Sequence, residues 1–295
     1  MNLSLEITGL TKSYADSGFM LDNVSLAIPN GTIMGFVGEN GAGKTTTIKS
    51  ILNTVHRDSG TIRLLGKEMK DEDTALREDI GVVLDSANFP AVLTPVKLGK
   101  VMRGIYKQWD QEVYVKLTEK FGLPMDRRIS GFSRGMTMKL AIAAAMSHHP
   151  KLLILDEATS GLDPVTREEI LEVFLEFVED ERHAILMSSH ITSDLEKIAD
   201  YITFIHRGKI ILTAMKDELI YDYGVARCTS DQFRRIAEGD RLAYRVKEHQ
   251  TDVLVKDRRG FGQQYSGITV DQVSIDEILL LLVKGGDSDA RTAAQ

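Results

Sequence analysis

The sequence predicts an α/β protein with a mainly parallel sheet, followed by a small α+β region. Between residues 151 and 205, short apolar runs alternate with helical stretches, which is typical of βαβ units on a parallel sheet. The run at 151–156 has an uninterrupted apolar centre, as expected for a strand that is buried on both faces. After about Tyr221 the pattern changes to short strands, a glycine-rich segment at 260–262 and one final helix.

The composition fits a folded protein and excludes several classes. The chain has 295 residues, a length that allows about two domains. Hydrophobic residues make up 43% and charged residues 27%, which excludes a disordered chain. The net charge of −7 disfavours a general nucleic-acid binder, so no nucleic-acid partner is expected. A single cysteine, Cys228, cannot form an intrachain disulfide and agrees with a reducing compartment.

We find no membrane-spanning or signal segment in the sequence. The longest apolar runs, such as 278–283, fall far short of the roughly 20 residues that a spanning helix needs. The N-terminus lacks the basic start and apolar core of a signal peptide. A cytoplasmic protein is therefore expected.

The first half of the chain predicts strands and then helices. Three β-branched runs, separated by turn residues, predict a β-rich opening at residues 3–8, 21–28 and 32–37. A helical stretch up to Asn53 follows, and two short strands are expected at 61–65 and 80–84. Apolar residues then recur at spacings of three and four over 95–121, which predicts two amphipathic helices.

The second half alternates helices with strands. A helix is expected at 133–146, and the later segments of the alternation are at 164–180, 183–188, 192–199 and 201–205. Short strands follow at 242–246 and 253–255. Ser274 opens a capping-box pattern, Ser-Ile-Asp-Glu, so the final helix is expected to be packed.

A glycine-rich turn between the strand ending at Val37 and the next helix matches the pattern of a P-loop. Its residues are Gly38, Glu39, Asn40, Gly41, Ala42, Gly43, Lys44 and Thr45. The glycines let backbone N–H groups surround phosphates at the start of a helix. Lys44 would neutralise the β and γ phosphates, and the Thr45 hydroxyl would ligate Mg²⁺.

The strand at 151–156 ends in carboxylates, the form expected of a Walker B element. Asp156 would hold Mg²⁺. Glu157, one residue further, would point at the water that attacks the γ-phosphate and act as general base or water orienter. Taken alone, an Asp-Glu pair after a strand is also a helix-start signal.

A serine opens the helix at 133–146, and a glycine follows two residues later. The residues of this motif are Ser133, Arg134, Gly135 and Met136. In isolation the motif is an ordinary helix N-cap. Together with the P-loop and Walker B elements, it resembles the LSGGQ-like signature that the ATP-binding-cassette (ABC) family carries a short way before Walker B.

The resemblance extends to three further places and covers roughly residues 3–220. Residues 160–163, ending in Asp163, are similar to the family's D-loop. His190 follows a predicted strand, as the family's switch histidine does. Tyr14 falls where the family places an aromatic residue that stacks on adenine.

Two parts of the sequence depart from the family pattern. The signature has Arg134 and Met136 where the family has Gly and Gln, a version that resembles those of bacterial exporter-type ATPases with a separate permease. Asp85 stands after the strand at 80–84, where the family has Gln. Its carboxylate can still ligate Mg²⁺ through oxygen. In isolation, Asp85 is also compatible with a surface turn residue.

The resemblance implies a P-loop ABC-type core over residues 1–220, with an antiparallel β layer and a helical subdomain at about 90–150. A small α+β appendix would follow at 221–286, and residues 287–295 would form a disordered tail. Two such cores would pair head to tail, as a homodimer or a heterodimer. Each ATP would lie between the P-loop and Thr46 of one subunit and the signature of the other.

The resemblance also implies roles for individual residues. Tyr14 would stack on the base, Glu157 would activate water, and His190 would stabilise the transferring γ-phosphoryl group. Asp163 would communicate across the interface between the subunits. Oxygen ligands for Mg²⁺ would come from Thr45, Asp85 and Asp156.

The implied function is the ATP-binding and ATP-hydrolysing subunit of an ABC transporter on the cytoplasmic face of the membrane. Because the sequence shows no spanning segment, it would power a separate multi-span permease, in the direction of export. One alternative is a soluble ABC ATPase that acts on nucleic acid or ribosomes, although such proteins usually have two cassettes, coiled coils or zinc modules. Another is a regulatory module that binds ATP without useful turnover.

Overall fold

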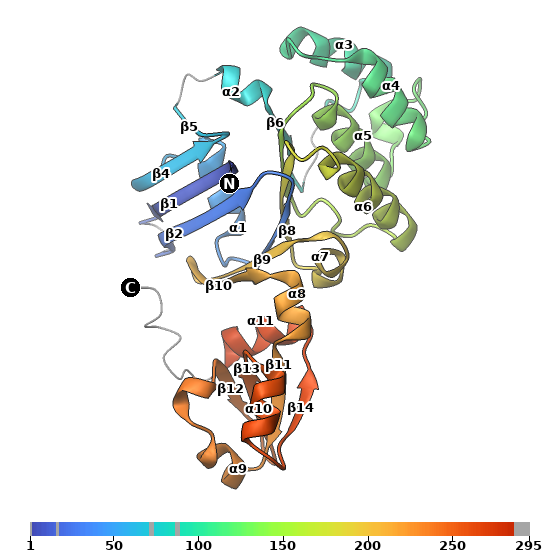
Figure 1. Cartoon of the computed structure of the whole chain (residues 1–295). Coiled ribbons are helices and arrows are strands. Elements are labelled where there is room, and N and C mark those ends of the chain that lie inside the picture. Colours follow the sequence, from blue (N-terminus) through green and yellow to red (C-terminus); the bar gives the residue numbers. More distant parts are fainter. Residues whose placement is uncertain (1, 16–17, 71–73, 86–88, 286–295) are drawn as a thin grey trace.

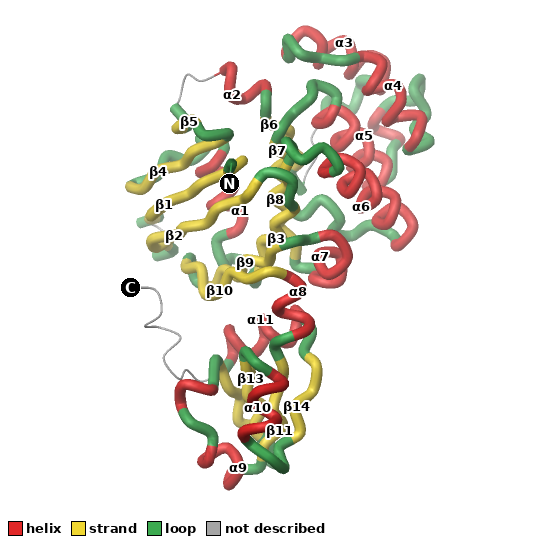
Figure 2. Tube along the Cα trace, in the orientation of Figure 1, coloured by secondary structure: helices red, strands yellow, loops and turns green. Residues whose placement is uncertain are grey.

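The computed structural model describes residues 2–15, 18–70, 74–85 and 89–285, and these residues form three sheets with helices around them (Figure 1). The tail predicted at 287–295 lies outside the described residues. Figure 2 shows the strands gathered in the three sheets, with helices packed around each of them.

The central sheet has six strands in the order β10-β9-β3-β8-β7-β6. Strands β6, β7, β8, β3 and β9 run parallel to one another, and β10 pairs antiparallel with β9. This arrangement confirms the predicted α/β fold with a mainly parallel sheet. The strands are β3 (Ile33–Val37), β6 (Ile80–Val83), β7 (Leu152–Asp156), β8 (Ala184–Ser189), β9 (Tyr201–His206) and β10 (Lys209–Met215).

An antiparallel sheet packs beside the central one, in the order β2-β1-β4-β5. Its strands are β1 (Leu3–Ser13), β2 (Met20–Pro29), β4 (Ser59–Leu64) and β5 (Lys67–Glu68). Helix α1 (Lys44–Ile51) joins the core between the two sheets, where Leu5, Phe36, Ile48 and Ile154 belong to one buried cluster. The antiparallel β layer is therefore present as expected.

The helices that follow β6 gather at one end of the molecule (Figure 1). They are α3 (Pro95–Ile105), α4 (Gln111–Lys120) and α5 (Arg134–Met146), with the short helix η1 (Ile129–Gly131) between α4 and α5. Another short helix, α2 (Thr74–Glu78), precedes β6. Thr94 and Asp110 cap α3 and α4, as their side chains accept backbone N–H groups of the first turn. The fully buried Tyr114 links these two helices, because its hydroxyl donates to the Pro95 carbonyl at 3.0 Å. The two predicted amphipathic helices are confirmed.

Two helices connect the later strands of the central sheet: α6 (Pro164–Val178) joins β7 to β8, and α7 (Thr192–Ile198) joins β8 to β9. Asp163 caps α6, with its side chain accepting the backbone N–H of Thr166 at 3.0 Å. Pro164 then occupies the first helical position, where its missing N–H costs nothing. These caps fix the direction in which the loop after β7 enters α6.

The third sheet is antiparallel, in the order β12-β13-β11-β14, and follows α8 (Lys216–Tyr221). The element order β11-α9-β12-β13-α10-β14 gives two interleaved split βαβ units of the ferredoxin-like kind. The bounds are β11 (Gly224–Cys228), α9 (Ser230–Arg235), η2 (Glu238–Asp240), β12 (Ala243–Val246), β13 (Thr251–Val255), α10 (Arg258–Gln264), β14 (Thr269–Gln272) and α11 (Ile275–Lys284). A domain boundary after residue 220 stays a prediction.

The prediction of a single helix after residue 221 was wrong, because α9 and α10 are also helical. The glycine-rich segment at 260–262 lies inside α10. Both helices are too short to show an apolar period in the sequence. They are held by their caps, Thr229 with Gln232 for α9 and Asp257 for α10, and by aromatic packing onto the third sheet.

The final helix, α11, joins the third sheet to the rest of the protein. Ser274 caps it as predicted, but the Glu277 carboxylate pairs with Arg227 at 2.7 Å instead of completing the capping box. Ile275 donates its backbone N–H to Glu196 of α7 at 3.1 Å, and the buried face of α11 shares one apolar cluster with Leu195. Within the described ranges, no helix has both the length and the apolar character needed to cross a membrane.

Candidate functional site

The glycine-rich turn runs from the end of β3 to the start of α1. Gly43 is the N-cap of α1 with φ of 119°, a backbone conformation that residues other than glycine rarely adopt. A Cβ atom at Gly38 would lie 2.4 Å from the Ile205 carbonyl oxygen, so only glycine fits there. These two glycines let the turn fold back over the N-terminus of α1, whose free N–H groups favour anions.

Lys44 is buried beneath this turn, with 6% of its surface exposed. Its Nζ donates to the carbonyl oxygens of Gly38 at 2.7 Å and Glu39 at 3.4 Å. The same ammonium lies 3.5 Å from Oε1 of Glu157. The Lys44 ammonium is thus surrounded by oxygen atoms. Phosphate oxygens of a bound nucleotide would be equivalent partners for it.

The carboxyl ends of β7 and β8 lie beside the end of β3, since these strands are parallel neighbours. The buried Asp156 at the end of β7 accepts the Thr45 hydroxyl at 3.0 Å through Oδ2. Its Oδ1 accepts the Ser188 hydroxyl at 2.5 Å. The predicted Mg²⁺ residues Thr45 and Asp156 are therefore in direct contact.

Glu157 follows in a left-handed conformation, with φ of 54°, which turns its side chain out of the strand. Its Oε2 lies 2.5 Å from Nδ1 of His190 and accepts the His190 backbone N–H at 3.4 Å. Its own backbone N–H donates to the Ser188 hydroxyl at 3.2 Å. The sequence reasoning missed Ser188, although its place two residues before His190 was the available signal.

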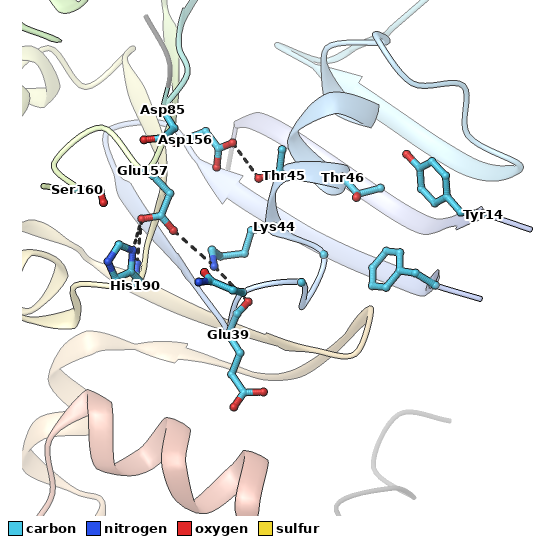
Figure 3. A pocket seen from close by; sticks show the side chains of 14 residues that line it. Tyr14, Glu39, Lys44, Thr45, Thr46, Asp85, Asp156, Glu157, Ser160 and His190 are labelled. Atoms are coloured by element: carbon cyan, nitrogen blue, oxygen red, sulfur yellow. Dashed lines mark hydrogen bonds and ion pairs between the residues drawn. The ribbon is translucent and has the colours of Figure 1, made fainter. Parts of the chain in front are cut away.

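These side chains line a cavity of about 780 Å³ (Figure 3). This volume is in the range of small-molecule sites. The predicted residues that line it are Tyr14, Glu39, Asn40, Gly41, Gly43, Lys44, Thr45, Thr46, Asp85, Asp156, Glu157 and His190. Two further residues line it: Ser160, which begins the predicted D-loop segment, and Phe19, which was not predicted. Within the described part of the chain, the predicted residues that do not line it are Gly38, Ala42, Ser133, Arg134, Gly135, Met136 and Asp163.

Two aromatic residues from the segment between β1 and β2, Tyr14 and Phe19, line the cavity, and Figure 3 shows Tyr14 at the end away from His190. The ring centroids of Tyr14 and Phe19 lie 6.4 Å apart, at 40° to each other. The Tyr14 backbone N–H donates to the Phe19 carbonyl at 2.9 Å, which brings the two residues to one turn. In Figure 3 the side chains of Lys44 and Thr45 lie between Tyr14 and Glu157, so polar groups occupy the centre of the cavity.

The signature residues lie at the start of α5. Ser133 caps this helix by accepting the Met136 backbone N–H at 3.2 Å. Arg134 donates to Oδ1 of Asp85 at 2.7 Å, so the two departures from the family pattern contact each other. Asp163 also has a local partner, since the Thr166 backbone N–H lowers the pKa of its carboxyl group.

The donor set fits ATP with a divalent cation. Hydroxyl and carboxylate oxygens are the ligands that Mg²⁺ prefers, and Thr45 and Asp156 provide one of each at the foot of α1. Lys44 adds a buried positive charge beside them. The cavity therefore offers separate places for a planar ring, a chain of phosphates and a hydrolytic water.

Comparisons with known proteins agree with this geometry. A family model described as ABC transporter matches residues 21–160. The chain is 33% identical over 270 residues to the bacitracin transport ATP-binding protein BcrA of Enterococcus faecalis, covering 87% of this chain and 83% of that protein. It is 38% identical over 213 residues to the lantibiotic transport ATP-binding protein SrtF of Streptococcus pyogenes, covering 70% of this chain and 89% of that protein.

A solved structure of an ATP-binding subunit of an ABC transporter has the same fold, with a TM-score of 0.64 and 26% identity. The match covers 73% of this chain and 91% of that one. The alternative of a soluble ABC ATPase acting on nucleic acid or ribosomes is not favoured by these relatives. The chain belongs to the ABC transporter family and is an ATP-binding, ATP-hydrolysing subunit of the exporter type.

Proposed function

We propose that Glu157 is the residue that activates water in this ATPase. Its carboxylate is shared between Lys44, 3.5 Å from Oε1, and His190, 2.5 Å from Oε2, at the wall of the cavity. This shared carboxylate is the observation that supports the proposal most strongly. A group between a phosphate-binding cation and a histidine is well placed to accept a proton from water that attacks the γ-phosphate.

The other polar residues of the cavity have supporting roles in this proposal. Lys44 binds the phosphates. His190, which contacts the other carboxylate oxygen of Glu157, stabilises the transferring γ-phosphoryl group. Oxygens of Thr45 and Asp156, with Asp85 at the same cavity, would hold Mg²⁺, which screens the phosphate charge when bound. Tyr14 stacks on the adenine ring, and Phe19 contacts the ring beside it.

A second subunit would complete the site. Ser133 and Gly135 stand at a helix N-terminus that, within the described residues, does not line the cavity of its own subunit. A helix N-terminus favours the γ-phosphate, so the signature is best used by the nucleotide of a partner. In this head-to-tail pair, Asp163 and the loop that it ends would lie near the interface.

The helical part would dock a separate permease at the cytoplasmic face of a membrane. Helix α3 exposes Val101 and Ile105, at 47% and 62% of their surface, beside Lys97 and Lys100. Exposed apolar residues that cluster on one surface indicate a contact site, whereas single exposed apolar residues do not. The names of the relatives support an exported antimicrobial substrate of the bacitracin or lantibiotic kind.

The permease can be identified by affinity purification. Tagged protein is recovered from detergent-solubilised membranes of its source cell, and co-eluting proteins are identified by mass spectrometry. We expect a stoichiometric multi-span protein that is lost in the Val101→Asp/Ile105→Asp variant. Val246→Asp is the control, since Val246 is also exposed, at 67%, but lies on β12 of the third sheet.

Two results of this purification would contradict the proposal. Co-elution of ribosomes or nucleic acid, without a membrane protein, would favour a soluble ABC ATPase. Retention of the membrane protein by the α3 variant would remove α3 from the docking surface. The substrate class is tested separately, because loss of the transporter should raise the sensitivity of the source cell to bacitracin or to a lantibiotic.

A further inference from the structure

Three buried polar atoms, one of Asp194 and two that act on its carboxylate, lie beside the loop between β7 and α6. Thr159 Oγ1, Arg167 Nε and Asp194 Oδ2 are each buried, and none has a hydrogen-bond partner among the residues that the structure describes. Buried polar groups in native proteins are nearly always paired. A cluster of three such atoms outside the ATP cavity therefore needs an explanation.

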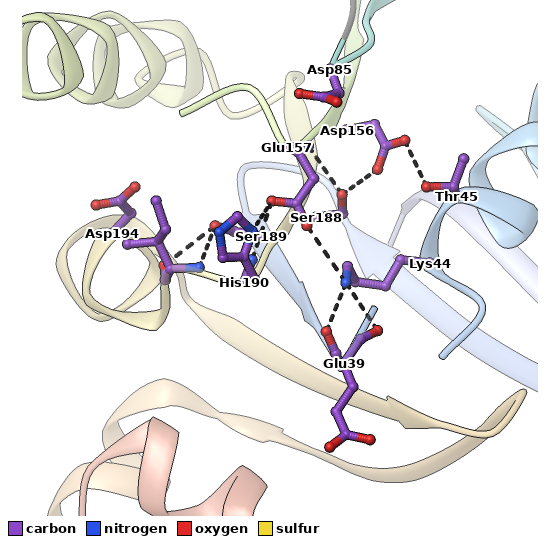
Figure 4. Close-up of polar contacts among 12 residues, drawn as sticks. Glu39, Lys44, Thr45, Asp85, Asp156, Glu157, Ser188, Ser189, His190 and Asp194 are labelled. Atoms are coloured by element: carbon purple, nitrogen blue, oxygen red, sulfur yellow. Dashed lines mark hydrogen bonds and ion pairs between the residues drawn. The ribbon is translucent and has the colours of Figure 1, made fainter. Parts of the chain in front are cut away.

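The three residues come from segments that serve the site. Thr159 lies two residues after Glu157 and begins the loop that leads to α6. Arg167 lies in the first turns of α6, and Asp194 lies in the first turn of α7, four residues after His190. Figure 4 shows Asp194 beyond His190, on the side away from Lys44.

Arg167 is the bridge between these segments. Its Nη2 donates to the carbonyl oxygen of Leu162, in the loop after β7, at 3.2 Å. Its Nε lies 3.7 Å from Oδ2 of Asp194. One guanidinium therefore contacts the loop at 159–163 directly and faces the helix that follows His190.

The contact with Asp194 is incomplete in this conformation. Asp194 is only 2% exposed, and burial raises the pKa of its carboxyl group, an effect that Thr159 and Arg167 oppose. The Thr159 hydroxyl is near enough to act on the carboxylate but is not in full hydrogen-bond geometry. An approach of less than about 1 Å would turn the 3.7 Å separation into a charge-assisted hydrogen bond.

We propose that Asp194 and Arg167 are positioning residues that link the loop at 159–163 to the His190 segment during ATP hydrolysis. Closing the Arg167–Asp194 contact holds the loop and the start of α7 together, and satisfies two of the three unpaired atoms, Arg167 Nε and Asp194 Oδ2. The energy gained on closing favours the conformation in which His190 and the loop are both in place. This inference rests on the proposed roles of Glu157 and His190.

The test uses Asp194→Asn, which keeps the shape of the side chain and removes its charge. ATP turnover, KM, nucleotide affinity and melting temperature are measured on the purified full-length protein. Substitutions in networks that couple two parts of a protein change the coupling by about two- to thirtyfold. We expect kcat to fall by about tenfold while nucleotide affinity changes less than about twofold.

The chain offers a matched control. Glu168 and Lys197 form a second ion pair between α6 and α7, but both of these side chains are half exposed, whereas Asp194 is buried. Lys197→Gln should keep the parental kcat. Asp194→Glu, with a longer carboxylate that can reach Arg167, should keep more turnover than Asp194→Asn.

Thr159→Val provides an independent variant if Asp194→Asn does not fold, because it removes only a buried hydroxyl and should also lower kcat. A parental kcat in both Asp194→Asn and Thr159→Val would overturn the inference. The inference would also be overturned if kcat fell only in proportion to a loss of nucleotide affinity or of folded protein. That result is expected if a water molecule bridges the three atoms and serves only the stability of the fold. Turnover by Glu157→Gln at the parental rate would instead reject the proposed function, independently of the Asp194 result.

Discussion

Nδ1 of His190 lies 2.5 Å from Oε2 of Glu157, at the wall of the nucleotide cavity. An ionised carboxylate only accepts hydrogen bonds, so this contact assigns the ring proton to Nδ1. The opposite nitrogen, Nε2, is then the atom available to the substrate side. Glu157 thereby fixes both the tautomer and the orientation of the histidine.

His190→Ala should lower ATP turnover while leaving ATP binding nearly unchanged. The phosphates are bound chiefly by the P-loop and Lys44, whereas His190 acts on the transferring group. Loss of one such stabilising group costs about 100-fold in kcat. Steady-state turnover and calorimetric ATP affinity check this expectation, and equal losses in both would assign His190 to binding instead.

Phe19→Ala should weaken ATP binding without changing the rate at saturation. The ring lines the cavity with its centroid 6.4 Å from that of Tyr14, and Figure 3 shows Tyr14 away from Glu157 and His190. Base stacking on an aromatic side chain contributes about 1–3 kcal/mol. Binding of ATP and of inorganic triphosphate separates the causes, since only ATP should lose affinity. An equal loss for triphosphate would show that Phe19 supports the P-loop rather than the base.

Asp85 and Arg134 should show a measurable coupling energy. Arg134 occupies the first position of α5, where a cation opposes the helix dipole, and the Asp85 carboxylate offsets this at 2.7 Å. Both side chains are about half exposed, so the coupling should be only about 0.2–1 kcal/mol. Urea unfolding of Asp85→Gln, Arg134→Gln and the double variant measures it. Strictly additive effects would mean that the pair contributes nothing to stability.

Cys228 should resist alkylation in the folded protein. The thiol is buried in the third sheet, and burial raises its pKa to about 11. The reactive thiolate is therefore scarce near neutral pH, and reactivity should rise as the pH approaches that pKa. Mass spectrometry after iodoacetamide treatment at about pH 8 should show label only when urea is present. Rapid labelling of the native protein would show that the third sheet opens readily.

Much of the site could be predicted because its chemistry is local in sequence. The P-loop glycines, Lys44 and Thr45 form one continuous motif, and Asp156 with Glu157 ends a recognisable apolar strand. Parallel pairing of β3, β7 and β8 then brings these motifs to one edge, as the alternation of strands and helices implies.

Most of the missed residues depend on tertiary contacts that the sequence alone does not show. Phe19 reaches the cavity through the turn between β1 and β2. Ser188 reaches Asp156 through the pairing of β8 with β7. The link between Arg167 and Asp194 requires α6 and α7 to pack together, although each residue looks like an ordinary surface charge in the sequence. Helices α9 and α10 were missed because short helices depend on caps and packing more than on a long apolar period.

The most direct measurement of the central claim is ATP binding and turnover by Glu157→Gln, with Lys44→Ala beside it. The amide keeps the size of the side chain but accepts a proton poorly, and loss of a general base costs about 10²–10⁴-fold in rate. Glu157→Gln should bind ATP at nearly parental affinity and lose almost all turnover, whereas Lys44→Ala should lose binding itself. Parental turnover by Glu157→Gln would contradict the assignment of Glu157 as the water-activating residue.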